Sequence, residues 1–241
     1  MIRSIYIFGW VAVSTFSLGC IAILLSFFGL TGNPIHKIAN VWARSILAVS
    51  GIDVTVKGLL DVDPAKSYIY MSNHQSNFDI WVLLAHLPVQ FRWLAKAELF
   101  KIPILNRSMR AAGYISIDRF NKQSAFNSIE QAAKTIREGV SVMIFPEGTR
   151  SLDGKIRSFK KGGFVLAVKS GVPIVPVIIH GTFPIMPKGR LRIKPGAVVL
   201  EIQKPIETAG YTLESKDALI DRVRRVMCES FQKGKEGEAS C

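Results

Sequence analysis

The first thirty residues constrain this chain most, because they contain a long apolar segment without a single charge. From Ile5 to Leu30 the segment is dense in Ile, Phe, Leu, Val and Trp. As a helix, it is long enough to cross a hydrocarbon core of roughly 30 Å. A secretory signal peptide fits less well, because its apolar core is usually only about 7–15 residues long and is followed by small residues at a cleavage site. The sequence therefore predicts an N-terminal membrane-anchoring helix over 5–30.

A second helix is predicted over 35–50, after a glycine-rich break. Its apolar residues recur at helical spacing, whereas Lys37 and Arg44 lie elsewhere on the helix. That pattern is typical of an interfacial amphipathic helix. Residues 1–50 are thus predicted to form a membrane anchor that either spans the bilayer or dips into one leaflet as two helices. The expected location is the inner or cell membrane, with the rest of the chain on the cytoplasmic side.

The charge of the chain is strongly positive and unevenly distributed. There are 31 Lys and Arg residues against 18 Asp and Glu, a net charge of +13, and every basic residue except Arg3 lies at or beyond Lys37. Such a field attracts nucleic acid, anionic membranes, acidic carrier proteins and phosphorylated substrates alike. The three cysteines lie far apart in sequence and show no metal or disulfide spacing, so we expect reduced thiols and no bound metal or cofactor.

From residue 52 onward, short β-branched runs alternate with helical stretches, which predicts a single α/β domain over 51–232. A frayed tail is expected over 233–241. The expected strands are 52–58, 67–73, 89–96, 112–119, 140–145, 173–181 and a pair within 191–202; the expected helices are 78–87, 121–139, 158–171 and a C-terminal one near 213–232.

The first chemically suggestive segment is Ser72–Asp79, which directly follows a predicted strand. His74 and Asp79 could not meet on one continuous helix, because a five-residue offset turns their side chains roughly 140° apart at about 3.6 residues per turn. They can meet if His74 lies on a loop and Asp79 in the first helical turn, and Ser76 with Asp79 has the capping-box spacing for that boundary. A carboxylate that fixes one imidazole nitrogen would make the other a general base. The alternative is a helix-capping Asp79 beside an ordinary loop histidine.

A second segment, Phe145–Ser151, follows the apolar run 140–145. It offers a glycine for close backbone approach, a hydroxyl from Thr149 and the planar donors of Arg150 at the end of a strand. Such a loop suits an anionic oxygen cluster such as phosphate. An ordinary surface turn with an ion-paired arginine is the alternative.

Four sequence blocks occur in order: Asn-His-x4-Asp, Gly-Tyr-Ile-Ser-Ile-Asp-Arg, Phe-Pro-Glu-Gly-Thr-Arg-Ser and Val-Pro-Ile-Val-Pro-Val. Together they resemble the blocks of the glycerolipid acyltransferases, most closely the bacterial 1-acyl-glycerol-3-phosphate acyltransferases. The resemblance covers roughly residues 35–210 and implies a mixed central sheet flanked by helices. It also implies an N-terminal membrane anchor.

The resemblance also assigns roles to residues. His74 and Asp79 match the catalytic dyad, and the block assigned to the acceptor phosphate supplies Glu147, Gly148, Thr149 and Arg150. Arg119 is a further phosphate candidate, and Lys96 is a weaker candidate for a phosphate or oxyanion contact.

The implied reaction is direct transfer of a fatty acyl group from acyl-carrier protein or acyl-CoA to the sn-2 hydroxyl of 1-acyl-sn-glycerol-3-phosphate. The product is phosphatidic acid, a precursor in phospholipid biosynthesis. No Gly-x-Ser-x-Gly nucleophile elbow is present, in agreement with a route that has no acyl-enzyme.

Two other functions stay open at this stage. The acceptor could be glycerol-3-phosphate, a lysophospholipid or a lyso-ornithine lipid. A non-enzymatic basic protein that binds the membrane surface would explain the charge but not the ordered blocks. A nucleic-acid partner is not expected, because no nucleic-acid-binding motif is present.

Overall fold

A seven-stranded mixed sheet forms the centre of the computed structural model, which describes residues 1–58, 62–63, 65–118 and 122–239. The strand order is β1-β7-β6-β2-β5-β3-β4, and every neighbouring pair is parallel except β6 and β7. The strands are β1 (Ile52–Lys57), β2 (Ile69–Ser72), β3 (Phe91–Lys96), β4 (Ile115–Ile117), β5 (Ser141–Ile144), β6 (Ile174–His180) and β7 (Gly196–Ile202). The predicted α/β fold with a mixed sheet and flanking helices is confirmed.

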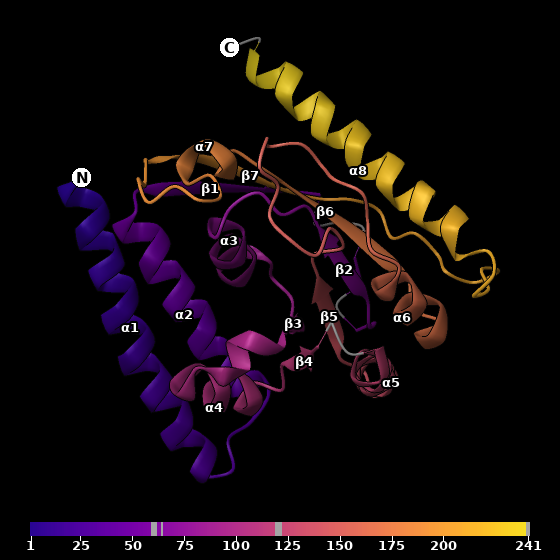
Figure 1. Cartoon of the computed structure of the whole chain (residues 1–241), viewed down its shortest axis with the longest axis horizontal. Coiled ribbons are helices and arrows are strands. Elements are labelled where there is room, and N and C mark those ends of the chain that lie inside the picture. Colours follow the sequence, from indigo (N-terminus) through magenta and orange to yellow (C-terminus); the bar gives the residue numbers. More distant parts are fainter. Residues whose placement is uncertain (59–61, 64, 119–121, 240–241) are drawn as a thin grey trace.

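Helices cover both faces of this sheet (Figure 1). On one side lie α1 (Ile2–Phe27), α2 (Asn33–Val49) and α3 (Phe78–His86). On the other side lie α5 (Lys122–Arg137), α6 (Gly162–Ser170) and α8 (Lys216–Ala239). The remaining short elements are η2 (Ala97–Lys101), α4 (Pro103–Ala111) and α7 (Thr182–Ile185). The molecule is therefore a three-layer sandwich with the two N-terminal helices along one flank.

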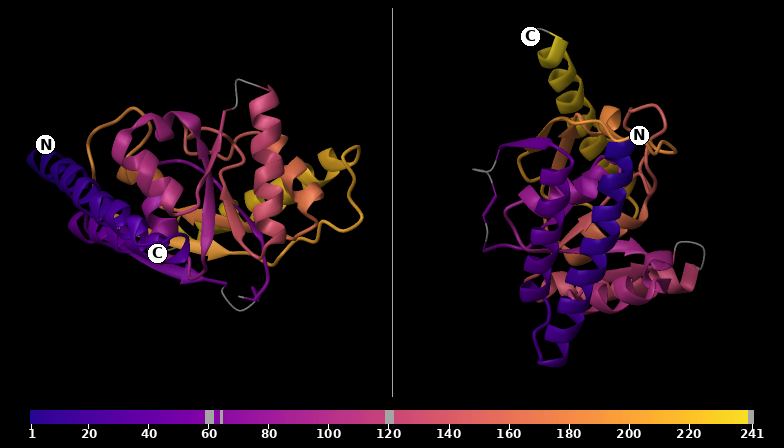
Figure 2. Two further views of the ribbon diagram at one scale, coloured as in Figure 1. Left: turned by 90° about the horizontal axis from the view of Figure 1, so that it is seen from below. Right: turned by 90° about the vertical axis from the view of Figure 1, so that its left-hand side faces the viewer.

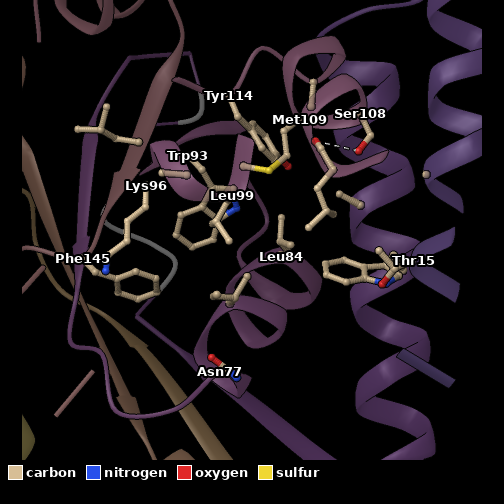
Figure 3. A pocket seen from close by; sticks show the side chains of 18 of the residues that line it. Thr15, Asn77, Leu84, Trp93, Lys96, Leu99, Ser108, Met109, Tyr114 and Phe145 are labelled. Carbon is tan, nitrogen blue, oxygen red and sulfur yellow. Dashed lines mark hydrogen bonds between the residues drawn. The ribbon is translucent and has the colours of Figure 1, made fainter. Parts of the chain in front are cut away.

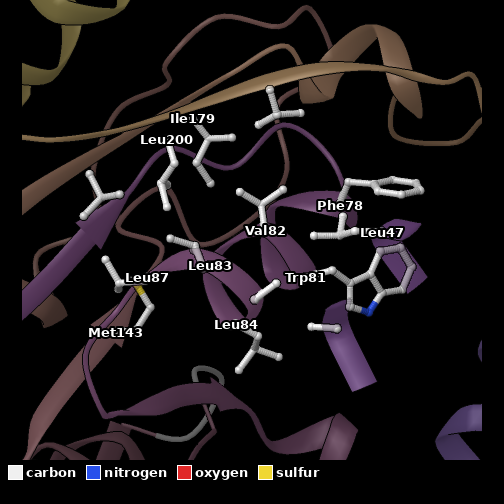
Figure 4. Packing of buried hydrophobic residues seen from close by; sticks show 14 of the residues in the cluster. Leu47, Phe78, Trp81, Val82, Leu83, Leu84, Leu87, Met143, Ile179 and Leu200 are labelled. Carbon is white, nitrogen blue, oxygen red and sulfur yellow. The ribbon is translucent and has the colours of Figure 1, made fainter. Parts of the chain in front are cut away.

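The hydrophobic core on the α3 side of the sheet is built around this short helix, which is apolar nearly all round. Phe78, Val82 and Leu83 of α3 are fully buried, and they pack with Ile179 and Leu200 of the sheet (Figure 4). A helix that is apolar on every side is stable only when it is surrounded. The packing consequently fixes the first turn of α3, where Asp79 lies, against the sheet.

Three parallel strands at the centre of the sheet, β5, β2 and β6, are direct neighbours. Their carboxyl ends therefore open at one edge, which is where ligands bind in α/β sheets. The loop after β2 begins at Asn73, whose side-chain amide exchanges two hydrogen bonds of 2.8 and 2.9 Å with the backbone of Ile179 in β6. That exchange locks the loop carrying His74 to the neighbouring strand.

Helix α1 lies along the body of the protein over much of its length (Figure 2). Near its start, the hydroxyl of Ser4 accepts a 3.0 Å hydrogen bond from the N–H of Ile193. In its middle, Thr15 accepts one of 3.1 Å from the Trp42 indole of α2. Farther along, Gly19 approaches α4 so closely that an added Cβ would lie 2.5 Å from a methyl group of Ile104. The helix is thus part of the folded domain as well as its apolar flank.

The interfacial role of α2 stays a prediction, and in the structure the apolar face of this helix packs against other parts of the protein. Ile35 and Ile46 are buried, and Trp42 packs on Trp81 of α3 with ring centroids 6.2 Å apart. The apolar face of α2 is turned into the protein. An amphipathic period does not distinguish a membrane from a protein core, because both are apolar partners.

Other differences concern short elements and the C-terminus. The sequence pattern does not predict η2, α4 or α7, and the predicted strand pair within 191–202 is one strand, β7. Residues 188–195 before it form a loop with Pro195 at its end. At the C-terminus, α8 continues through Ala239 where a frayed tail was expected.

Candidate active site

The imidazole of His74 and the carboxylate of Asp79 are in direct contact. His74 Nδ1 lies 2.8 Å from Asp79 Oδ2, with His74 on the loop after β2 and Asp79 in the first turn of α3. The loop-to-helix boundary on which the predicted pairing depends is therefore present. Because Nδ1 donates to the carboxylate, the proton-accepting nitrogen of a neutral His74 is Nε2.

Asp79 is fully buried and every oxygen of its carboxylate is used. Oδ2 also accepts the backbone N–H groups of Gln75 at 2.6 Å and Ser76 at 2.8 Å, while Oδ1 accepts the hydroxyl of Thr182 at 2.5 Å. The N–H contacts are those of a residue that caps a helix start. Capping and orientation of His74 are thus two functions of the same carboxylate.

The loop after β5 holds the backbone of His74 from both directions. The N–H of His74 donates to Glu147 Oε1 at 2.8 Å, and its carbonyl accepts the N–H of Ser151, also at 2.8 Å. Glu147 Oε2 accepts the N–H of Arg157 at 2.9 Å. Burial raises the pKa of Glu147, and the N–H groups of Arg157 and His74 partly oppose that rise. Glu147 therefore ties two loops together, and its carboxylate does not face the cavity described below.

The flat face of the His74 ring rests on Phe145. Their centroids are 3.9 Å apart and their planes differ by 9°. Trp93 stacks on Phe145 in turn, at 5.3 Å. With one face covered and Nδ1 fixed, the imidazole has a defined orientation, and its side chain remains 13% exposed at the cavity.

A cavity of about 580 Å³ opens at His74 and extends between α1, α2, α3 and α4. Figure 3 shows its side chains: Phe145 and Lys96 lie toward the sheet, Leu84 and Trp93 further in, and Thr15 of α1 on the opposite wall. The walls are mostly apolar and include Leu18, Ala22, Ile35, Ile38, Ala39, Trp42, Leu105 and Met109. The size and lining suit a hydrocarbon chain.

Polar and cationic groups gather where this cavity meets His74. Gly148, Thr149 and Arg150 line it there, as the sequence predicts for a loop at the end of β5. Lys96, at the carboxyl end of β3, lines it as well and is exposed. Arg119 lies outside the described residues. No group of three or more His, Cys, Asp or Glu side chains arranged to hold a metal occurs in the described parts of the chain.

Two residues of this region are not predicted from the sequence. Lys188 lines the cavity and donates to the hydroxyl of Thr149 at 3.0 Å, and Thr182 contacts Asp79. Both belong to the connection between β6 and β7. A local sequence pattern cannot predict that this connection contacts the catalytic loop, because Thr182 and Asp79 are 103 positions apart.

The other buried histidines lie outside the candidate site. His36 is fully buried with Nδ1 3.0 Å from the hydroxyl of Tyr114, and burial together with nearby Arg92 lowers the pKa of His36 to about 4. His180 lies near Glu201 and stacks on Phe231 beneath α8. Neither lines the cavity.

Comparisons with known proteins agree with this architecture. A family model described as "Acyltransferase" matches residues 53–180. The chain is 34% identical over 197 residues to 1-acyl-sn-glycerol-3-phosphate acyltransferase alpha of Homo sapiens, covering 81% of this chain and 70% of that protein. It is 34% identical over 227 residues to the chloroplastic 1-acyl-sn-glycerol-3-phosphate acyltransferase BAT2 of Brassica napus, covering 88% and 64%.

A solved structure is similar over nearly the whole chain. The crystal structure of the 1-acyl-sn-glycerophosphate acyltransferase PlsC from Thermotoga maritima matches with a TM-score of 0.82 and 31% identity, covering 97% of this chain and 95% of that one. The chain therefore belongs to the acyltransferase family that includes the 1-acyl-sn-glycerol-3-phosphate acyltransferases. It spans only 54–64% of the length of several plant and algal relatives.

Proposed function

We propose that the protein transfers a fatty acyl group from an acyl thioester to the sn-2 hydroxyl of 1-acyl-sn-glycerol-3-phosphate, giving phosphatidic acid. The observation that carries this proposal is the His74–Asp79 pair at the mouth of an apolar cavity, beside the cations Arg150 and Lys188. The activity named for the human, rapeseed and Thermotoga relatives supports it.

In this mechanism His74 Nε2 removes the proton of the acceptor hydroxyl as that oxygen attacks the thioester carbonyl. Asp79 keeps Nδ1 protonated and stabilises the imidazolium that forms. The thiolate then leaves, and the proton on His74 is available to it. The two substrates react directly, so no protein nucleophile is required.

The apolar cavity accepts a fatty acyl chain, and the cations beside His74 bind the acceptor phosphate. Arg150 supplies a planar set of donors, Lys188 a point charge, and Thr149 and Gly148 a hydroxyl and a close backbone approach. Arg119 and Lys96 are further candidates for contacts with anionic oxygens. Glu147 acts indirectly, by holding the His74 loop.

The direct test is an assay of purified protein in detergent with lysophosphatidate and either acyl-CoA or acyl-carrier protein. We expect release of free thiol and formation of phosphatidic acid. Glycerol-3-phosphate, a lysophospholipid with a larger headgroup and a lyso-ornithine lipid serve as competing acceptors. If the enzyme used one of these acceptors faster than lysophosphatidate, that compound would be the acceptor instead. If no acceptor gave thiol release, a non-enzymatic binding protein would be favoured.

Arg150→Lys is expected to raise the KM for lysophosphatidate with little change in the KM for the acyl donor. Loss of a charged hydrogen bond costs roughly 1.5–3 kcal/mol, which corresponds to about a 10- to 150-fold change. Lys188→Ala should act on the same ligand, so the double variant should cost less than the sum of the two. Steady-state kinetics with each substrate varied in turn measure these effects.

Arg190→Lys is the matched control, because Arg190 is exposed on the same connection as Lys188 and does not line the cavity. It should leave both KM values unchanged. Equal effects of Arg150→Lys on donor and acceptor, or none on the acceptor, would contradict the phosphate site.

We further propose that α1 anchors the protein in one leaflet of the inner membrane, with the α/β body on the cytoplasmic side. Helix α1 is long and apolar enough to cross a membrane. Its contacts with α2, with α4 and, through Ser4, with Ile193 keep it against the body, which supports an in-plane position. Its outer face exposes large apolar side chains such as Ile5, Val13, Phe16 and Leu24, each more than half accessible.

Replacing these four outward side chains by serine is expected to lower partitioning onto phospholipid vesicles by roughly several hundredfold or more. Each apolar side chain withdrawn from hydrocarbon forfeits on the order of 1–3 kcal/mol. Flotation assays measure binding, and turnover of a short-chain, water-soluble acceptor should be retained. Deleting residues 1–30 would be a poorer test, because Leu18, Gly19 and Ala22 form part of the cavity wall.

Leu213→Ser serves as the control, since Leu213 is an exposed leucine on the loop before α8. Unchanged vesicle binding by the α1 variant would show that another surface anchors the protein.

A further inference from the structure

The connection that follows β6 contacts the catalytic loop at several points, and its conformation is fixed by the sheet. Gly181, directly after β6, has φ 86°, and a Cβ there would lie 2.3 Å from the carbonyl oxygen of Ala197 in β7. Only glycine fits this turn. The turn therefore sets the position of the next residue, Thr182, at the start of α7.

Thr182 is completely buried, and its hydroxyl donates to Asp79 Oδ1 at 2.5 Å. Four residues later, the carbonyl of Met186 accepts the hydroxyl of Ser76 at 2.8 Å, and Pro187 forms a bridge with Ser76. The connection thus contacts the catalytic loop at Ser76 and at Asp79. The contacts of Met186 and Pro187 hold Ser76, whereas Thr182 binds the carboxylate of Asp79 itself.

We propose that Thr182 is a positioning residue of the reaction, which acts on the His74–Asp79 pair through the carboxylate of Asp79. The inference rests on the proposed roles of His74 and Asp79. Oδ2 accepts three N–H groups, and a rotation of the carboxylate about the Cβ–Cγ bond would move both oxygens away from their donors. The Thr182 hydroxyl holds Oδ1 against this rotation, and it thereby helps to keep Oδ2 directed at His74 Nδ1.

A buried carboxylate oxygen also needs a donor, because water cannot reach it. Removing the hydroxyl leaves Oδ1 of Asp79 without one and frees the carboxylate to turn toward another donor. The His74 ring then loses its fixed orientation. The expected consequence is a slower chemical step, whereas substrate binding in the cavity, which Thr182 does not line, is unaffected.

Thr182→Val, which replaces the hydroxyl by a methyl group of similar size, tests this directly. We expect kcat to fall roughly 10- to 150-fold, the range for loss of a hydrogen bond to a charged group, with both KM values unchanged. Thr182→Ser keeps the hydroxyl and should restore kcat to near the wild-type value. A purely structural role predicts instead that Val and Ser variants differ in melting temperature but not in kcat.

Thr208→Val is the matched control. Thr208 is also buried, and its hydroxyl donates to the carbonyl of Val172 at 3.1 Å, away from the cavity. This variant should lose stability comparably and keep its kcat. His74→Ala is assayed in parallel, so that two failures can be told apart. An active His74→Ala enzyme would overturn the dyad; an inactive one, combined with equal kcat for Thr182→Val and Thr208→Val, would overturn the role of Thr182 alone.

Discussion

Replacing His74 by alanine is expected to lower kcat by roughly 100- to 10,000-fold, the range that general-base catalysis supplies. The imidazole is the group whose free nitrogen faces the cavity while its other nitrogen is held by Asp79. Its backbone N–H and carbonyl are bound by Glu147 and Ser151 whichever side chain is present, so the loop should keep its course. KM values should change little, because the proton is transferred only as the bond forms. Thiol release under saturating substrate measures the effect.

His86→Ala provides the comparison, because His86 is a half-buried histidine at the end of α3, the helix that carries Asp79, and does not line the cavity. It should retain nearly full activity. A His74→Ala enzyme within tenfold of the wild type would contradict the assignment of His74 as the base. Circular dichroism and melting curves of both variants separate loss of chemistry from loss of fold.

The contact between His74 and Asp79 could be predicted from sequence because a single local event creates it. A strand ends, a polar loop follows, and an apolar helix starts within the span of the motif. The approach of the second loop was also foreseeable in part, since β5 is a buried apolar run and the carboxyl ends of parallel neighbours share one edge. Arg150 and Thr149 accordingly line the same cavity as His74.

The role of Glu147 could not be predicted from local sequence. Its motif resembles a phosphate-binding block, which predicts a ligand contact for Glu147. In the structure both its oxygens accept backbone N–H groups, one from each of two loops. A sequence motif records which residues are needed together, and it does not separate those that touch a ligand from those that hold the loop.

The walls of the cavity could not be predicted from local sequence patterns. Helix α4 is a short, largely polar segment that packs against α1, and η2 packs on α4, β3 and β4. The inward face of α2 has the same periodicity as a membrane-surface helix. Contacts between elements far apart in the chain, such as Gly19 with Ile104, depend on the whole fold, and a single sequence carries no local signal for them.

Asp79→Asn is expected to reduce kcat by roughly 100- to 10,000-fold while the protein still folds. The amide oxygen must occupy the Oδ2 position, because an NH2 group there would face the donors from His74, Gln75 and Ser76. The NH2 group then points to Thr182, whose hydroxyl can rotate to accept it. Asparagine therefore preserves the hydrogen-bond pattern, and what it removes is the negative charge that stabilises the imidazolium in the transition state.

This substitution separates the two functions of the carboxylate, because the amide oxygen of asparagine can still accept the N–H groups of Gln75 and Ser76. If Asp79 only capped α3, both kcat and the melting temperature would stay near the wild-type values. If it also stabilises charged His74, kcat falls while the melting temperature changes little. Asp153→Asn is the control, since Asp153 likewise accepts loop donors, from Ser151 and Lys155, but is exposed and outside the cavity. If the Asp79 and Asp153 variants were equally active, Asp79 would only cap the helix. The charge of Asp79 would then not stabilise His74 during the reaction.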